Sequence, residues 1–395
     1  MRWLALIVLV GVACRSEPSR RPQAKFVLDV GARVNRSALT PSGTIVVATA
    51  KEVLGFREGE RAWGQELPLA PWLVALADES VVTRGSDSRL LAFDAATGRT
   101  VWTVGSRIET DEPLDAADLN TLGRFAWAAP QALARTSSAG KETLVSILED
   151  GRILRVSPER CRARDARACS RVVGRLEGRE LSSALELETL SDGSLVLIDV
   201  DGLSVFGPTG AFKLALRANE LMSGARPHGR HLVVAIDDKV VALDPDRCAS
   251  LLPISLTGTS SASMAPPPGC VVWSRPAPGL ALHAPAIVGD QIIANAGDGT
   301  VFATSEATAR VDLEAIGPVI ARTHSPEVVT LAASSGDGRL RVLEIDAKDR
   351  SVKEARLPIE LPGLVVSSNE LVLQVAGSFV LAGYGSRIAL VSLSR

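Results

Sequence analysis

The sequence contains few aromatic residues and almost no imbalance of charge. Its 395 residues include one Tyr, eight Phe and six Trp, and 43 basic residues stand against 45 acidic ones, for a net charge of −2. A near-neutral chain lacks the basic footprint that a nucleic-acid-binding protein shows. We therefore expect no nucleic-acid partner.

Long apolar runs and helical periodicity are also missing. After the N-terminus, no stretch is long and apolar enough to be a membrane helix. No window keeps the helical apolar period for long, which excludes a helical solenoid. The 33 Gly and 22 Pro instead indicate many turns between short elements, as in an all-β protein.

The N-terminal stretch MRWLALIVLVGVAC has a short basic start and an apolar run that ends at a cysteine. This pattern predicts a signal peptide over residues 1–13. Cys14 resembles the lipidated cysteine of a bacterial lipobox, although Gly11 stands where Leu is usual. Ordinary cleavage after Ala13 is the alternative. If Cys14 is lipidated, residues 14–25 carry the lipid and form a flexible tether to the membrane.

Four further cysteines form two local pairs along the chain. Cys161 and Cys169 bracket a charged loop, and Cys248 and Cys270 bracket a Ser/Pro-rich one. An even number of cysteines in an exported protein predicts disulfides, and local pairing is favoured. Zinc is the alternative, but a Cys-x7-Cys spacing without a nearby His is poor for that metal.

A short pattern recurs eight times along the chain. Each copy is a turn containing Gly or Asp followed by an alternating apolar strand, at residues 51–56, 86–94, 149–157, 200–207, 237–244, 297–305, 336–346 and 383–393. A similar strand precedes many copies, so each pair predicts a β-hairpin. Residues 26–395 divided by eight give about 46 residues per repeat, enough for a four-stranded propeller blade.

We therefore predict an all-β fold: a single β-propeller over residues 26–395, with four-stranded blades. Eight blades are expected, and seven remain the alternative. Pairing of residues 26–30 with residues 388–393 would close the ring and remove exposed strand edges.

Three Gly-x-x-x-Trp spacings follow copies of the repeat, at Gly59–Trp63, Gly98–Trp102 and Gly269–Trp273. The second copy also has Asp94 and Thr97 before the glycine, and it matches the tryptophan-docking motif of PQQ-like repeats. The chain therefore resembles the PQQ-like (quinoprotein-type) β-propeller repeat family. It is most similar in kind to the cofactor-free bacterial lipoprotein branch, which includes the propeller lipoprotein of the outer-membrane β-barrel assembly machine.

The resemblance implies a packing role for these residues. The glycine would allow a tight turn, and the Trp would lie flat between neighbouring blades with its indole N–H on a backbone carbonyl. Asp94 and Thr97 would brace the turn through bonds to the backbone.

Quinone-dependent members of this family have adjacent cysteines, a Trp floor and calcium or lanthanide ligands, and the chain has no adjacent cysteines and no CxxCH haem motif. The sequence also lacks G-x-S-x-G, phosphate-loop and H-E-x-x-H motifs. His228 and His231 lie in a basic loop and are interpreted as a solvated turn. We therefore expect no catalytic residues, no cofactor and no metal.

The expected function is a scaffold for other envelope proteins, in outer-membrane protein assembly by analogy with the lipoprotein branch. The expected location is the periplasmic side of the outer membrane, through a lipid anchor, as a monomer within a complex. Loop 105–125 is long and acidic and is either a partner site or solvated filler. The alternative function is binding of a small ligand, or quinone-dependent dehydrogenase chemistry, at the axis of the ring.

Overall fold

The computed structural model describes residues 24–392 with internal gaps. The gaps are residues 69, 86–88, 106–129, 139–140, 164–168, 177–185, 200–201, 218–221, 237–238, 252–267, 277–284, 289–290, 297–298, 304–307, 312–314, 326–327, 336–338, 347–351, 361–371 and 377. The predicted signal peptide, Cys14, nearly all of the predicted tether and almost all of loop 105–125 lie outside the described residues.

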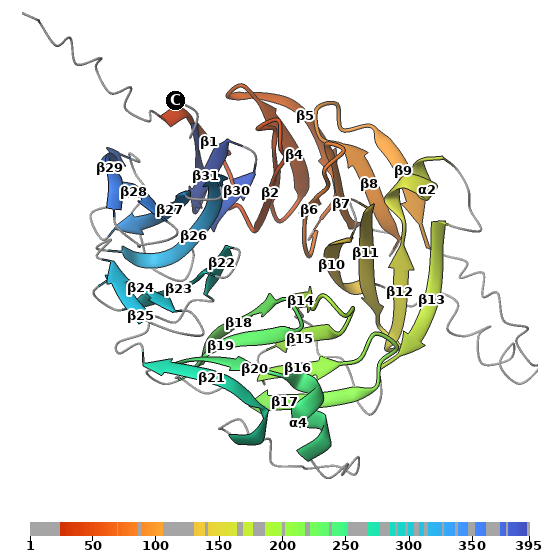
Figure 1. The fold of residues 1–395 in the computed structure, drawn as a ribbon. Coiled ribbons are helices and arrows are strands. Elements are labelled where there is room, and N and C mark those ends of the chain that lie inside the picture. Colours follow the sequence, from red (N-terminus) through yellow and green to blue (C-terminus); the bar gives the residue numbers. More distant parts are fainter. Residues whose placement is uncertain are drawn as a thin grey trace, which may run out of the picture.

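The described strands form eight four-stranded antiparallel sheets, arranged in a ring around a central axis (Figure 1). We number these sheets as blades in chain order. Blades 1 to 4 contain β2 (Arg36–Leu39), β3 (Ile45–Ala48), β4 (Glu52–Arg57), β5 (Glu60–Glu66); β6 (Val74–Ala75), β7 (Ser80–Arg84), β8 (Leu90–Asp94), β9 (Thr100–Val104); β10 (Pro130–Ser138), β11 (Lys141–Leu148), β12 (Arg152–Val156), β13 (Ser170–Arg175); β14 (Glu186–Thr189), β15 (Leu195–Asp199), β16 (Gly202–Phe206) and β17 (Phe212–Arg217).

Blades 5 to 8 continue the same order. They contain β18 (Met222–His228), β19 (His231–Ile236), β20 (Lys239–Leu243), β21 (Val271–Pro276); β22 (Ala286–Val288), β23 (Gln291–Ala296), β24 (Gly299–Ala303), β25 (Thr308–Val311); β26 (Ala315–Ser325), β27 (Val328–Ser335), β28 (Arg339–Asp346), β29 (Val352–Glu360); and β30 (Val372–Ala376), β31 (Phe379–Tyr384), β32 (Arg387–Ser392) with β1 (Ala24–Asp29). The predicted all-β propeller of four-stranded blades is confirmed.

Each of the eight sequence repeats coincides with the third strand of a blade, counted outward from the axis. These strands are β4, β8, β12, β16, β20, β24, β28 and β32. In seven of the eight blades a turn containing Gly or Asp connects the second strand to the third, and blade 1 has Thr49, Ala50 and Lys51 there.

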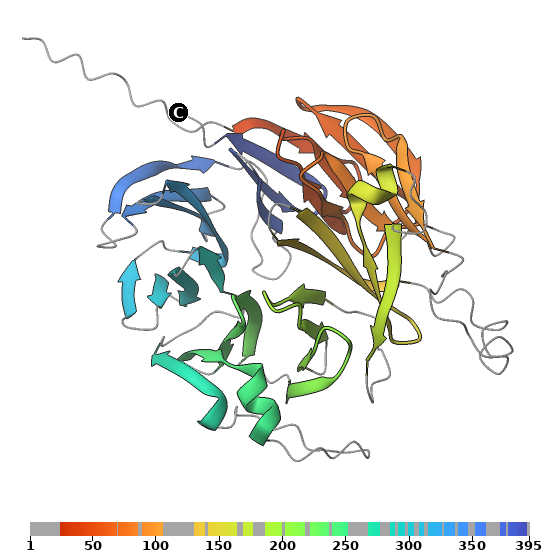
Figure 2. The ribbon, with the colours of Figure 1, turned by 45° about the vertical axis from the view of Figure 1, so that its right-hand side comes forward.

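The two ends of the chain meet in blade 8. There β1 pairs antiparallel with β32, with Val27 opposite Ala389 and Leu28 opposite Ile388. The predicted ring closure is confirmed. The first strands of successive blades also contact one another around the whole ring, so the blades surround one axis (Figure 2).

Aliphatic side chains fill the joints between blades. One buried cluster joins Ile147 and Ile153 of blade 3 to Leu187, Leu195 and Phe206 of blade 4. Flat sheet faces pack best when such side chains interdigitate. A blade alone would expose both faces, so closing the ring stabilises every blade through its two neighbours.

Short helices interrupt two blades between their third and fourth strands. They are α2 (Pro158–Arg162) in blade 3, and α4 (Pro245–Leu251) with the 3₁₀ turn η1 (Pro268–Cys270) in blade 5. No helix within the described ranges has the length and apolar character needed to span a bilayer.

Candidate functional sites at the blade joints and the axis

Trp63 lies in the joint between blades 1 and 2. It projects from β5, and its indole Nε1 donates a hydrogen bond of 2.7 Å to the carbonyl oxygen of Ala95 in blade 2. Its ring meets Phe93 edge-on, with the ring centroids 5.3 Å apart. An amphipathic ring suits this joint because its body contacts apolar groups while its N–H finds a polar partner.

The turn that receives Trp63 runs from Asp94 to Gly98, and we call it the docking turn. The Oδ1 atom of Asp94 accepts bonds from the Thr97 amide (2.8 Å) and from the Thr97 hydroxyl (2.7 Å). Gly98 has a φ of +70°, and a methyl group added there would come within 2.6 Å of the Trp63 ring. A glycine is therefore needed both for the backbone conformation and for the approach of the indole.

Trp102 occupies the equivalent position between blades 2 and 3, but its polar contact differs. The side chain is 5% exposed and packs in one cluster with Leu154, Cys161 and Cys169 of blade 3. Its Nε1 has no hydrogen-bond partner in the described structure. The expected bond to a carbonyl was therefore wrong for Trp102, because α2 replaces the open docking turn in blade 3.

Trp273 projects from β21 into the joint between blades 5 and 6. It is half-buried and packs against Val233 and Ala242 of its own blade and Ile292 of the next one. Gly59, which precedes Trp63, has a φ of +92° in the hairpin between β4 and β5.

The structure joins the cysteines as the pairs Cys161–Cys169 and Cys248–Cys270, with Cα atoms 4.5 and 4.7 Å apart. All four cysteines are buried in the joints. We call the described parts of residues 157–169 and 244–270 the cysteine caps.

The cysteine caps are modified docking turns. The sequence predicts this for the Gly269–Trp273 copy, with an insertion from Pro245 to Pro268 at its turn, but the equivalence was missed for blade 3. In the docking turn, the Asp94 amide donates to the carbonyl of Arg99, and the Gly98 amide donates to the carbonyl of Asp94. In blade 3, the Ser157 amide donates to the carbonyl of Cys169, and the Cys161 amide donates to the carbonyl of Ser157. In blade 5, the Asp244 amide donates to the carbonyl of Cys270, and the Cys248 amide donates to the carbonyl of Asp244. The repeated strings SPERC and DPDRC, at 157–161 and 244–248, are a signal that could have revealed the equivalence.

Each cysteine cap is also tied to the preceding blade by an ion pair. Arg162 of α2 contacts Asp78 of blade 2, with Nη2 2.5 Å from Oδ2. Asp246 of α4 contacts Lys213 of blade 4 at 2.6 Å, and Lys213 also lies 3.4 Å from Asp192. Each cap therefore fastens two neighbouring blades together through both apolar and charged contacts.

These contacts move the pKa values of the charged groups in blade 4. Burial alone would lower the pKa of Lys213, but bonding to Asp246 and attraction to Asp192 raise it. Burial alone would raise the pKa of Asp192, but bonds from Ser194 and the charge of Lys213 lower it. Burial raises the pKa of Glu188 against the opposing charge of Arg226.

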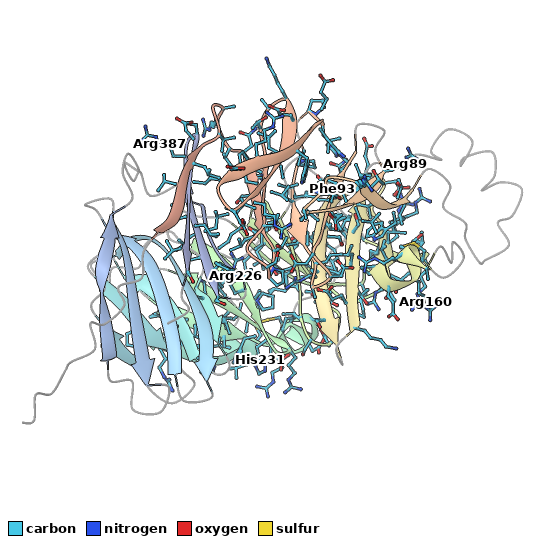
Figure 3. The ribbon with its side chains drawn as sticks, turned by 90° about the horizontal axis from the view of Figure 1, so that it is seen from above. Arg89, Phe93, Arg160, Arg226, His231 and Arg387 are labelled. Carbon is cyan, nitrogen blue, oxygen red and sulfur yellow. A yellow bond between two sulfur atoms is a disulfide. The ribbon has the colours of Figure 1, made fainter. Side chains whose placement is uncertain are left out.

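The two faces of the ring carry different turns. Figure 3 shows the ring edge-on, with Arg160 of α2 and His231 toward one face and Arg89 and Arg387 toward the other. The face with Arg160 carries the cysteine caps and the turns between first and second strands. His231, at the hairpin between β18 and β19, has a pKa lowered by burial and by nearby positive charges, against the pull of Asp244.

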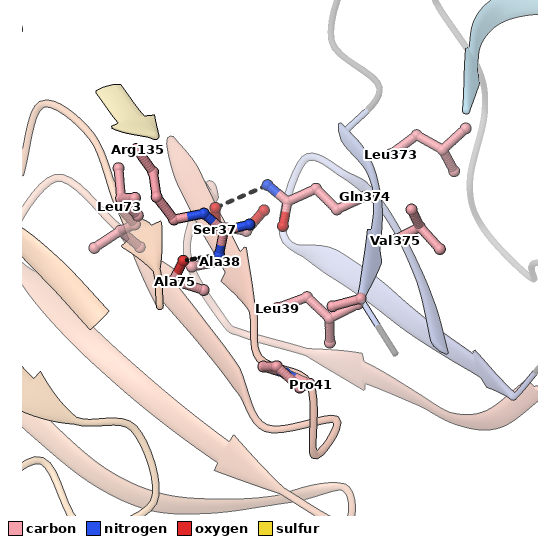
Figure 4. Close-up of a pocket in the computed structure, with 12 residues that line it drawn as sticks. Ser37, Ala38, Leu39, Pro41, Leu73, Ala75, Arg135, Leu373, Gln374 and Val375 are labelled. Carbon is pink, nitrogen blue, oxygen red and sulfur yellow. Dashed lines mark hydrogen bonds between the residues drawn. The ribbon is translucent and has the colours of Figure 1, made fainter. Parts of the chain in front are cut away.

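A cavity of about 760 Å³ lies beside the axis, lined by the inner strands β2, β6, β10 and β30 (Figure 4). Arg135 crosses it and donates a 2.7 Å bond to the carbonyl of Ala75. The amide of Gln374 donates to the carbonyl of Ser37 at 2.9 Å, which links blade 8 to blade 1. Apolar side chains such as Leu73 and Leu373 form much of the remaining wall.

No cluster of three or more metal-ligating side chains occurs within the part of the chain that the structure describes. Asp94 and Thr97 are committed to the docking turn, and the described tryptophans of the motif lie in blade joints. The residues of the sequence motif therefore have packing roles in this geometry.

The ring of four-stranded blades and its repeats define the fold as a β-propeller. Residues 15–176 match the family model described as outer membrane protein assembly factor BamB. A comparison with curated protein sequences finds no match.

A solved structure shows the same fold at low sequence identity. The computationally designed Ika8 protein superimposes with a TM-score of 0.53 and 15% identity, over 94% of this chain and 99% of that one. BamB from Moraxella catarrhalis gives a TM-score of 0.49 and 11% identity, over the same shares of the two chains.

Proposed function

We propose that this protein is a non-catalytic β-propeller scaffold of the bacterial cell envelope, tethered to the outer membrane through Cys14, and that it takes part in outer-membrane protein assembly. The observation that carries the proposal is the match of residues 15–176 to the BamB family model. Fold alone selects no function, so the sequence match carries more weight than the ring.

The geometry supports a binding role for the exposed turns. Trp63, Trp102 and the cysteine caps fasten the joints between blades 1 and 2, blades 2 and 3, and blades 4 and 5, which stiffens this part of the ring. Partner-binding residues are commonly placed on loops that a rigid scaffold positions. Within the described residues, that face also carries the turns that follow β2, β6, β14 and β18.

The test is co-purification from detergent-solubilised membranes of the native bacterium, with a tag at the C-terminus. We expect subunits of the barrel-assembly machinery to co-purify with the wild-type protein. Recovery of the protein alone would contradict the assembly role.

The tether is tested separately with Cys14→Ala. We expect the wild-type protein to incorporate radiolabelled palmitate and to sediment with membranes, and C14A to do neither. Equal labelling of both proteins would rule out Cys14 as the lipidated residue.

The cavity of about 760 Å³ beside the axis favours a second candidate, binding of a small ligand there. Its mixed wall, with Arg135 and Gln374 among apolar side chains, would suit a small amphipathic molecule. A screen of quinones and saccharides that produces no change in melting temperature would count against this candidate.

A further inference from the structure

A second pocket, of about 500 Å³, opens on the inner rim between blades 3 and 4, on the face that carries the cysteine caps. Its wall comes from strands of blade 3, the turn between β14 and β15, and residues of the blade 5 hairpin. Hydroxyl groups line it densely: Thr136, Ser137, Thr143, Thr189 and Ser191. Val145, Leu190 and Pro227 add an apolar part.

Arg155 of β12 is the notable charged group in this wall. It has no hydrogen bond or ion pair to any other described residue, and its Nε is shielded from solvent without a partner. A buried guanidinium donor without an acceptor is unfavourable, and most buried polar groups in folded proteins are paired. An unpaired group of this kind therefore points to a missing partner.

The surroundings of Arg155 add positive charge. Its cross-strand neighbour on β13 is Arg171, and like charges directly opposite each other destabilise a sheet. Arg135 lines the same pocket. Two acids oppose this charge: Glu142 lies 3.5 Å from Arg135, and Asp192, which itself lines the pocket, accepts bonds from Ser194 and contacts Lys213.

We propose that this pocket binds a carboxylate side chain from an acidic segment of a partner protein, with Arg155 as its main donor. Arginine presents a planar fork that matches a carboxylate in a bidentate pair. The hydroxyls would complete the acceptor's bonds, and Val145, Leu190 and Pro227 would contact the apolar stem of the side chain. The volume exceeds that of one small anion, which favours a peptide segment. This inference rests on the proposed scaffold function and names the chemistry of its partner.

The experiment measures binding of a hexaglutamate peptide, acetylated and amidated at its ends, by isothermal titration calorimetry. A hexaglutamine peptide is the neutral control, and inorganic phosphate is the competitor. Arg155→Gln removes the proposed donor. Arg171→Gln is the matched control, because Arg171 is an exposed arginine on the neighbouring strand that does not line the pocket.

We expect Arg155→Gln to weaken hexaglutamate binding by about tenfold or more, and Arg171→Gln to change it less than about twofold. Arg155→Lys should give an intermediate affinity, and it replaces Arg155→Gln if that variant does not fold. Equal binding by wild type and Arg155→Gln, or no binding of hexaglutamate, would overturn the inference. So would phosphate binding as tightly as the peptide, which would indicate a site for small anions.

Failure here is distinguishable from failure of the scaffold function. If barrel-assembly subunits co-purify equally with wild type and Arg155→Gln, the scaffold stands and the acidic segment is rejected. If nothing co-purifies with the wild-type protein while hexaglutamate still binds at Arg155, the assembly role is rejected and the site remains.

Discussion

The joints on either side of blade 2 are each filled by a Trp side chain, but the two Trp side chains pack against different surfaces. Trp63 enters the open docking turn of blade 2 and donates to the carbonyl of Ala95. Trp102 enters the cysteine cap of blade 3, is more deeply buried and leaves its Nε1 unpaired in the described structure. The surface presented by the next blade, rather than the Trp itself, therefore decides whether the indole N–H is satisfied.

Blade 5 extends the comparison to a third surface. Its cysteine cap has the same backbone bonds as that of blade 3, but it receives Leu214 of blade 4 instead of a Trp. The ion pair is also reversed: α2 supplies an Arg to the preceding blade, whereas α4 supplies an Asp. Backbone bonds and a disulfide define the cap, and the side chains that it receives can vary.

The largest loss of stability should come from removing the Trp side chains that fill these joints. Trp102→Ala leaves a cavity in a closed joint and should cost about 3–5 kcal/mol of unfolding free energy. Trp63→Ala should cost less, because Trp63 is only half-buried. Urea unfolding followed by circular dichroism measures both values. An equal or larger loss for Trp63→Ala would break the proposed difference between the joints.

The next effect concerns the caps. Replacing Cys161 and Cys169 together by Ser should cost about 2–3 kcal/mol, because the reduced chain is less restricted when unfolded. The matched pair, Cys248 and Cys270, closes a longer loop, with a sequence separation of 22 against 8. Replacing Cys248 and Cys270 together by Ser should therefore lower the free energy of unfolding somewhat more. Thermal unfolding of the two double variants under oxidising conditions tests this order, and unchanged stability in either would show that its cap does not restrain the blade.

Local patterns predicted much of this fold. The eight copies of the repeat located the third strand of every blade, and in seven of them a Gly or Asp turn marks its start, because a tight turn depends on a few neighbouring residues. The closing pair, β1 with β32, followed from the need to cover strand edges. The Gly98–Trp102 spacing located the joint between blades 2 and 3, because the motif combines a turn and a joint-filling Trp in one short segment.

The ion pairs of the cysteine caps and the Arg155 pocket depend on distant contacts and were missed for that reason. The pairing of Arg162 with Asp78 joins residues 84 positions apart. The lack of a partner for Arg155 can be seen only once blades 3 and 4 are packed together. The unpaired Nε1 of Trp102 likewise reflects α2 in the next blade, which the docking motif of blade 2 does not contain.

A smaller difference in stability should distinguish the docking turn of blade 2 from the cysteine cap of blade 3. Asp94→Ala removes an acceptor for the amide and hydroxyl of Thr97, and it should cost about 1 kcal/mol. Ser157 is the equivalent residue in blade 3, where its side chain makes no capping bond. Ser157→Ala should therefore change stability by less than about 0.5 kcal/mol. Urea unfolding of both variants decides the point, and equal losses would mean that the two turns are braced alike.

The smallest effect is a pH dependence of the joint between blades 4 and 5. The folded-state pKa of Asp192 is lowered, so its contribution is present above the unfolded pKa and is lost as pH falls through the folded pKa. Lys213 has a raised pKa, so its contribution is lost only as pH rises through that folded value. Both are therefore fully present near neutral pH.

Glu188 in the same blade has a raised pKa, so acidification should favour the folded state through this group. Between neutral pH and about pH 3, Asp192→Asn should lose less stability than wild type, and Glu188→Gln should lose more. Urea midpoints measured across this pH range give the change in stability with pH for wild type and for each variant. Because both carboxyl groups are partly exposed, high salt should reduce the difference. If Asp192→Asn loses as much stability on acidification as wild type does, the Lys213 bridge does not hold Asp192 in its charged form.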